Sequence, residues 1–411
     1  MNDVLALFDV LNGDNLQQAR RADRMLRERL CRAQSAHAEF ALWCRAASVR
    51  GGALSWRGTQ CLCAVLHEHP TLPAAPLAAT ALQRAAGTTA TPGTHPAARH
   101  CALLGALQLT RAVLRCPCTP EAAVPVLAAA AAAVDAAHPT ETAVEAAETA
   151  YEAARLCAAA ATRLPLPEGN GKGVSATEAQ THYFCALREA AGLYARVMER
   201  VAPVFAREEA QTSATVTCAL LGDVRALERR AARVTLVAGW LLVRAAGAAG
   251  ADAGALAVQV QRVLADVSLD EQFALLQDSD SALVKVLEAG AHAAVCTGLP
   301  LEVRCAVWTV CTGTLDRLLD LVGNDFAVIT DLVCHSETHA LSFLVRFLHA
   351  LLSTSCPVAP AAAVRYRAML RAVSDSAQQG AFPFSAAPLV ALITRYLTMD
   401  EELEDVSAES L

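Results

Sequence analysis

Two cysteines and two histidines lie within one nine-residue segment, CLCAVLHEH. They are Cys61, Cys63, His67 and His69. Thiolates and imidazoles are good zinc ligands, but on a helix Cys61 and Cys63 point about 200° apart, and no second half-site follows at zinc-finger spacing. Cys116 and Cys118 form a Cys-Pro-Cys turn that only the tertiary fold could bring close. The spacing therefore predicts buried core cysteines and no bound metal.

A second pair of histidines, His335 and His339, lies in the segment CHSETH with Glu337 between them. A zinc-protease helix needs glutamate directly after its first histidine, where this chain has Ser336. Ser336 is predicted to cap a helix over 337–353, which would leave His335 outside that helix. The segment predicts no metal site.

The segment GNGKG, residues 169–173, has only part of the pattern of a phosphate-binding loop. Such a loop needs glycine five residues before its Gly-Lys pair and Ser or Thr after the lysine. Leu166 and Gly173 occupy those positions. The chain also lacks a Gly-x-Ser-x-Gly nucleophile elbow. We therefore predict no catalytic residue and no cofactor, although a pocket of convergent titratable groups cannot be read from sequence.

Arginines gather on two predicted helices. The first helix, from about Asn15 to Arg32, carries Arg20, Arg21, Arg24, Arg27, Arg29 and Arg32, and the later helix carries Arg225, Arg229, Arg230 and Arg233. Guanidinium rows bind acidic peptides or phosphates through paired hydrogen bonds. The predicted partner-binding residues are Arg20, Arg24, Arg27, Arg225 and Arg229. The alternative is a solvated face, because acidic residues are interspersed.

The composition predicts a folded, all-α chain. Of the 411 residues 54% are hydrophobic and 18% charged, and the net charge is −7, which argues against a nucleic-acid binder. Alanine, the best helix former, makes up more than a fifth of the chain, whereas Phe and Tyr are scarce. The opening residues, MNDVLALFDV, have no basic region of a secretory signal. The apolar run VTLVAGWLLV, residues 234–243, is too short to cross a bilayer. We expect a chain without a membrane span, in the cytoplasm or nucleus, with reduced cysteines.

Helical periodicity positions these residues along nearly the whole chain. Thr119-Pro120-Glu121 is a helix start, and Ser268 to Glu271 is a capping box. After Ser268, helical segments alternate with short turns over 269–278, 281–289, 300–321, 325–334, 337–353, 361–375 and 386–398. In 337–353, Leu341, Leu344, Val345, Leu348, Leu351 and Leu352 form an apolar face that Phe343 and Phe347 widen.

Such a wide apolar face predicts a helix that is covered on two sides, as in stacked helical hairpins. We therefore predict an armadillo/HEAT-like superhelix, with a non-repeat all-α domain as the alternative. The predicted parts are an N-terminal helical region over 1–163, a Pro/Gly linker or long loop over 164–175, a helical-repeat region over 176–399 and an acidic disordered tail over 400–411.

The segment NDFAVITDLVCHSETHALSFLVRFLHALL, residues 324–352, resembles the C-terminal part of the Lines family. The similar residues are Asp331-Leu332, Ser336-Glu337-Thr338, Leu341, Phe343-Leu344 and Arg346-Phe347-Leu348. A looser similarity extends over the chain from Ser268. The resemblance implies a helical-repeat regulator that acts through protein contacts in cytoplasm and nucleus, with no catalytic residues to carry over.

These features together predict a non-catalytic scaffold or regulatory adaptor. Helical-repeat grooves bind extended peptides or helices, so the expected partners are other proteins, including acidic or helical peptides. The alternative function is a helical structural subunit of a larger assembly. A mean hydropathy of +0.33 favours that alternative, because apolar surface would then be covered by partners.

Overall fold

The described part of the chain is helical throughout its regular structure. The computed structural model describes residues 56–68, 74–89, 96–116, 119–137, 142–164, 176–210, 219–249, 254–335, 338–353 and 358–409, with eight residues between 17 and 28. These described residues contain helices and turns but no strand, which confirms the predicted all-α class.

The chain forms two compact units, residues 1–242 and 243–411. The first contains α4 (Trp56–Glu68), α5 (Ala75–Thr89), α6 (Pro96–Arg115), α7 (Pro120–Ala137), α8 (Ala143–Arg163) and α9 (Ala176–Ala210). Helix α10 (Ala219–Ala249) includes the boundary. The second contains α11 (Gly254–Ala265), α12 (Leu269–Leu276), α13 (Asp280–Val295), α14 (Leu301–Leu321), α15 (Phe326–Cys334), α16 (Ala340–Leu352), α17 (Pro360–Gln378) and α18 (Ala387–Glu409). Residues 165–175 of the predicted linker lie outside the described part.

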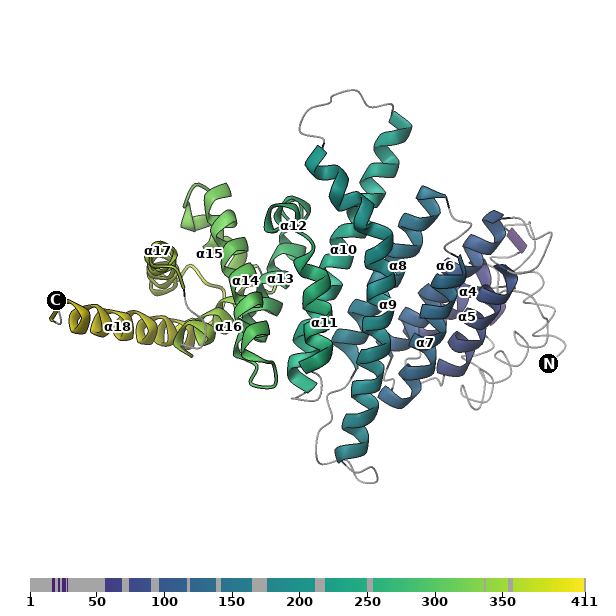
Figure 1. Cartoon of the computed structure of the whole chain (residues 1–411), viewed down its shortest axis with the longest axis horizontal. Coiled ribbons are helices and arrows are strands. Elements are labelled where there is room, and N and C mark those ends of the chain that lie inside the picture. The colour runs from purple at the N-terminus through teal and green to yellow at the C-terminus, as the bar shows by residue number, and fades with distance from the viewer. Residues whose placement is uncertain are drawn as a thin grey trace. The chain divides into compact units, whose positions relative to one another are not determined.

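The helices of the first unit pack in two rows (Figure 1). Helices α4, α6 and α8 lie side by side in one row, and α5, α7 and α9 lie side by side in the other. Helix α7 buries Ala123, Ala130 and Ala133 completely. Alanine allows two helix backbones to approach closely, so the alanine-rich sequence of α7 is used for contact with α5 and α9.

Side-chain caps fix the predicted helix starts. The amide of Ala122 donates to Thr119 Oγ1 at 3.3 Å at the start of α7. At α12 the predicted capping box of Ser268 and Glu271 is present in both directions. Thr142 and Glu145 form a further capping box at α8. Each cap satisfies amide groups that a helix start leaves without an intrahelical acceptor.

An aromatic cluster forms the core of the second unit. The ring centroids of Trp308 on α14 and Tyr366 on α17 each lie 5.3 Å from that of Phe347 on α16. Leu344 and Leu348 are 1% and 0% exposed, which confirms their predicted burial. Phe343 and Phe347, expected only to widen the apolar face, belong to its buried centre, whereas Leu341, Val345, Leu351 and Leu352 are half-buried. Helix α16 packs on α13, α15 and α18, so it is covered on more than one side as predicted.

Helix α16 begins three residues later than predicted. Its N-cap is His339, in the left-handed region with φ 61°, and not Ser336. The Thr338 hydroxyl donates to Leu332 O at 2.7 Å and accepts from the amide of Ala340 at 3.4 Å, which ties the turn to the end of α15. Since the turn interrupts the helix, His335 and His339 do not share a helix face. Ser336 and Glu337 lie outside the described residues.

Two further elements bear on the expected tail and on membrane spans. Helix α18 runs to Glu409, through the acidic segment whose composition predicts disorder, because Glu, Leu and Ala are good helix formers. Within the described residues, helices Pro120–Ala137 and Val224–Ala249 are long and apolar enough to cross a bilayer. The second is 72% buried inside the protein, as is typical of a core helix. The apolar run 234–243 is too short to span a bilayer, but the helix that contains it, Val224–Ala249, has the length to do so.

Candidate functional site

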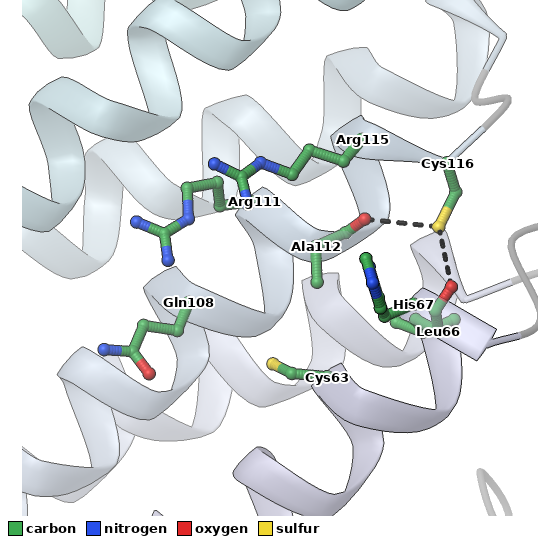
Figure 2. Close-up of a pocket in the computed structure, with 8 residues that line it drawn as sticks. All are labelled: Cys63, Leu66, His67, Gln108, Arg111, Ala112, Arg115 and Cys116. Carbon is green, nitrogen blue, oxygen red and sulfur yellow. Dashed lines mark hydrogen bonds between the residues drawn. The ribbon is translucent and has the colours of Figure 1, made fainter.

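A pocket of about 220 Å³ lies between α4 and α6 in the first unit (Figure 2). Its lining residues are Cys63, Leu66, His67, Gln108, Arg111, Ala112, Arg115 and Cys116. Residues 108, 111, 112 and 115 recur at helical spacing, so one face of α6 forms one wall of the pocket. Helix α4 supplies the opposite wall. The pocket thus combines two arginines, an amide and an imidazole with apolar surface.

A buried carboxylate on α8 holds the arginine side of the pocket in place. Glu152 is 6% exposed. Its Oε2 accepts from Arg111 Nη1 at 2.7 Å, and its Oε1 accepts from Gln108 Nε2 at 3.1 Å. Arg155 lies 3.6 Å from the same carboxylate. Burial is the main cause that lowers the pKa of Arg111, and the nearby Glu152 opposes that effect. The position of the Arg111 guanidinium is therefore fixed by Glu152, a carboxylate that also contacts Gln108 and Arg155.

Arg115 supplies positive charge that no described carboxylate neutralises. Its side chain is exposed and, among the described residues, makes no ion pair. Figure 2 shows it reaching back along α6 toward Arg111, and its charge also lowers the pKa of Arg111. Arg111 and Arg115 line the pocket without a carboxylate, and Glu152 beside it neutralises one of these two charges, which leaves a local charge of about +1. The pocket is therefore suited to an anionic group from another molecule.

The two thiols of the pocket are poor nucleophiles. Burial raises the pKa of Cys63 to about 11, although Arg111 partly opposes the shift. Burial also raises the pKa of Cys116. The Cys116 thiol points to backbone carbonyls, with Ala112 O at 3.2 Å and Leu66 O at 3.6 Å. Because the thiolate is the reactive form, both groups remain inert thiols at neutral pH.

Three of the residues considered as zinc ligands do meet in this pocket. Cys63, His67 and Cys116 all line it, so the fold brings Cys116 to the helix that contains His67. The Cys61 side chain, His69 and Cys118 lie outside the described residues. Within the described part, no three His, Cys, Asp or Glu side chains are grouped closely enough to hold a metal ion.

The predicted partner-binding arginines that the structure describes lie elsewhere. Arg24 is exposed, in a helical stretch where Leu26 is fully buried, and Arg20 and Arg27 lie outside the described residues. On α10, Arg225 is exposed and Arg229 is half-buried. None of the described three lines the pocket.

Neither the pocket residues on α6 nor their partner Glu152 on α8 were found from sequence. The available signal was the i, i+4 pair Arg111 and Arg115 in the last two turns of the helix. Its partner Glu152 lies 41 residues downstream of Arg111, so only the packing of α6 on α8 reveals the pairing.

Comparison with known proteins gave no match: neither a protein-family model, nor a curated protein sequence, nor a solved structure is similar to this chain. The resemblance of residues 324–352 to the Lines family therefore stays a hypothesis.

Proposed function

We propose that this chain is a non-catalytic scaffold or adaptor, and that its α4–α6 pocket receives an acidic side chain of a partner protein. The proposal is carried by one observation, the surplus of positive charge in a pocket that Arg111 and Arg115 line and no described carboxylate lines, while the neighbouring Glu152 is buried and already paired. The apolar residues Leu66 and Ala112 would contact the aliphatic part of the bound segment.

The state of the pocket thiols supports binding over catalysis. A cysteine enzyme needs a thiolate held by a cation or helix terminus. At Cys63 the protonated thiol is favoured instead, because burial raises its pKa more than Arg111 lowers it.

The proposed architecture is an armadillo/HEAT-like array. The two rows of alternating helices in the first unit support it, because stacked hairpins place every second helix in the same row. We also propose a location in the cytoplasm or nucleus, and the similarity of residues 324–352 to the Lines family is consistent with such a role.

The test is fluorescence anisotropy with two labelled eight-residue peptides, one of alternating Glu and Ala and one of alternating Lys and Ala. The acidic peptide should bind, and high salt should weaken it because exposed charges are screened. Arg115→Gln should weaken binding several-fold. Arg188→Gln is the matched control, because this arginine is 61% exposed in the same unit and outside the pocket. Equal binding by both variants, or binding of the basic peptide alone, would refute the proposal that the pocket receives an acidic side chain.

A structural subunit remains the second proposal, and the mean hydropathy of +0.33 favours it, because a permanent partner would cover apolar surface. Light scattering on purified protein distinguishes the two functions. A soluble monomer favours the adaptor, whereas insolubility without a co-purified partner favours the subunit.

A further inference from the structure

A second cationic cluster lies in the C-terminal unit, around the buried carboxylate of Glu288 on α13. Glu288 is 8% exposed. Its Oε1 accepts from the Ser342 hydroxyl at 2.8 Å and lies 3.3 Å from Arg346 Nε on α16. Its Oε2 lies 3.5 Å from Arg244 Nη1 on α10. One carboxylate thus holds two guanidiniums that come from different helices.

The neighbouring histidine adds no charge to this cluster at pH 7. Arg346 Nη1 is hydrogen-bonded to His292 Nδ1, one turn along α13 from Glu288. Burial, then Arg346 and Arg244, lower the pKa of His292 to about 4, so its ring is neutral at pH 7 and acts as an acceptor. The carboxylate of Glu288 remains the only described anion that pairs with these arginines.

Arg304 on α14 adds a third guanidinium with unused hydrogen-bonding capacity. Its Nε is buried and has no hydrogen-bond partner in the described part of the chain, where Arg304 also forms no ion pair. Arg244, Arg304 and Arg346 all act electrostatically on the Cys296 thiol that follows α13, so the three charges converge on one region. A buried donor without an acceptor costs free energy, which a ligand oxygen would recover.

We propose that Arg244, Arg304 and Arg346 form a binding site for a phosphate monoester. Three arginines and one glutamate leave a local charge of about +2, and a phosphate monoester carries about −1.5 to −2 at pH 7. A carboxylate would neutralise only half of that surplus. The fork of N–H groups on each guanidinium suits phosphate oxygens. The site lies in the other unit from the α4–α6 pocket and does not depend on that pocket's function.

The test is calorimetric titration of the whole chain with inorganic phosphate at constant ionic strength. Wild-type protein should bind phosphate, and Arg304→Gln should bind roughly ten-fold more weakly, because one charge-assisted contact is lost. Arg304→Gln should fold normally, since no described ion pair or hydrogen bond is removed, and circular dichroism checks this. Arg262→Gln, an exposed arginine on α11 of the same unit, is the matched control and should bind like wild type.

A second arm separates free phosphate from a phosphorylated protein segment. The peptide Ala-Gly-Ser-Gly-Ala is titrated with and without phosphate on its serine. Tighter binding of the phosphopeptide than of inorganic phosphate assigns the site to a phosphorylated partner, and the reverse order assigns it to free phosphate.

The His292 ring gives an independent readout. A dianion beside it favours the imidazolium form, so saturating phosphate should raise the pKa of His292 in an NMR titration. The proposal is overturned if neither ligand binds above a chloride control, or if Arg304→Gln and Arg262→Gln bind equally.

Discussion

Glu152 and Glu288 have the same role at the level of single residues, since each is a buried carboxylate that pairs with a guanidinium from another helix. Glu152→Gln should lower the free energy of unfolding by about 3–5 kcal/mol, because Arg111 would keep its charge in a mostly buried position without a counter-charge. Thermal unfolding of the variant measures the loss. Glu148→Gln is the control on the same helix, where the side chain is 41% exposed and its change should cost much less. Equal losses of stability in the two variants would show that burial of the Glu152–Arg111 pair does not cause the destabilisation.

The residue His292 makes stability depend on pH. Its pKa is lowered from 6.5 to about 4 by burial, Arg346 and Arg244, with Glu288 opposing. Between those two values the unfolded chain binds more protons, so the free energy of unfolding falls as the pH drops from 6.5 toward 4. The melting temperature of wild type should fall more between pH 7.5 and pH 5 than that of His292→Gln. An NMR titration midpoint near 6.5 for this ring in the folded protein would contradict the assignment.

At the scale of the helices, two glycines differ in whether a neighbouring helix leaves room for a side chain. A Cβ added at Gly290 on α13 would lie 2.9 Å from Cys311 Cβ on α14, closer than two such atoms normally approach. Gly290→Ala should therefore destabilise the protein despite the better helix propensity of alanine, because α13 and α14 must separate. At Gly192 on α9 the nearest atom is the flexible end of Arg196, at 3.4 Å. Gly192→Ala should be neutral or stabilise by up to about 1 kcal/mol. Chemical denaturation of both variants tests the contrast, and the opposite order would contradict it.

Helix α16 is the element whose burial matters most in the C-terminal unit. Leu348→Ala should cost about 2–5 kcal/mol, and Phe347→Ala about 3–5 kcal/mol, through lost transfer free energy and the cavity left behind. Arg24→Ala, at an exposed position, should change stability by less than about 0.5 kcal/mol. Melting temperatures of the three variants provide the measurement. A neutral Leu348→Ala beside an unfolded Arg24→Ala would reverse the assignment of core and surface.

At the scale of the whole molecule, the described residues predict a far-UV circular dichroism spectrum dominated by α-helix, because their regular structure is helical in both units. Reduced and oxidised samples should give the same spectrum, since the described cysteines are free and Cys157 and Cys311 are buried. A substantial β-sheet contribution would contradict the fold.

The sequence alone determined the class of the fold and many of its boundaries. Alanine content, caps at Thr119 and Ser268 and the period of the C-terminal apolar residues act over a few neighbouring positions, so they can be read locally. Tertiary structure decided the rest. The left-handed turn at His339 makes α16 begin later than the sequence predicts. Thr338 in this turn is hydrogen-bonded to Leu332 on α15, a contact between two helices that local sequence does not reveal. Both arginine clusters depend on carboxylates that are distant in the chain, as in the pairs Glu152 with Arg111 and Glu288 with Arg346. Local periodicity places each residue on a helix face, but only packing determines which faces meet.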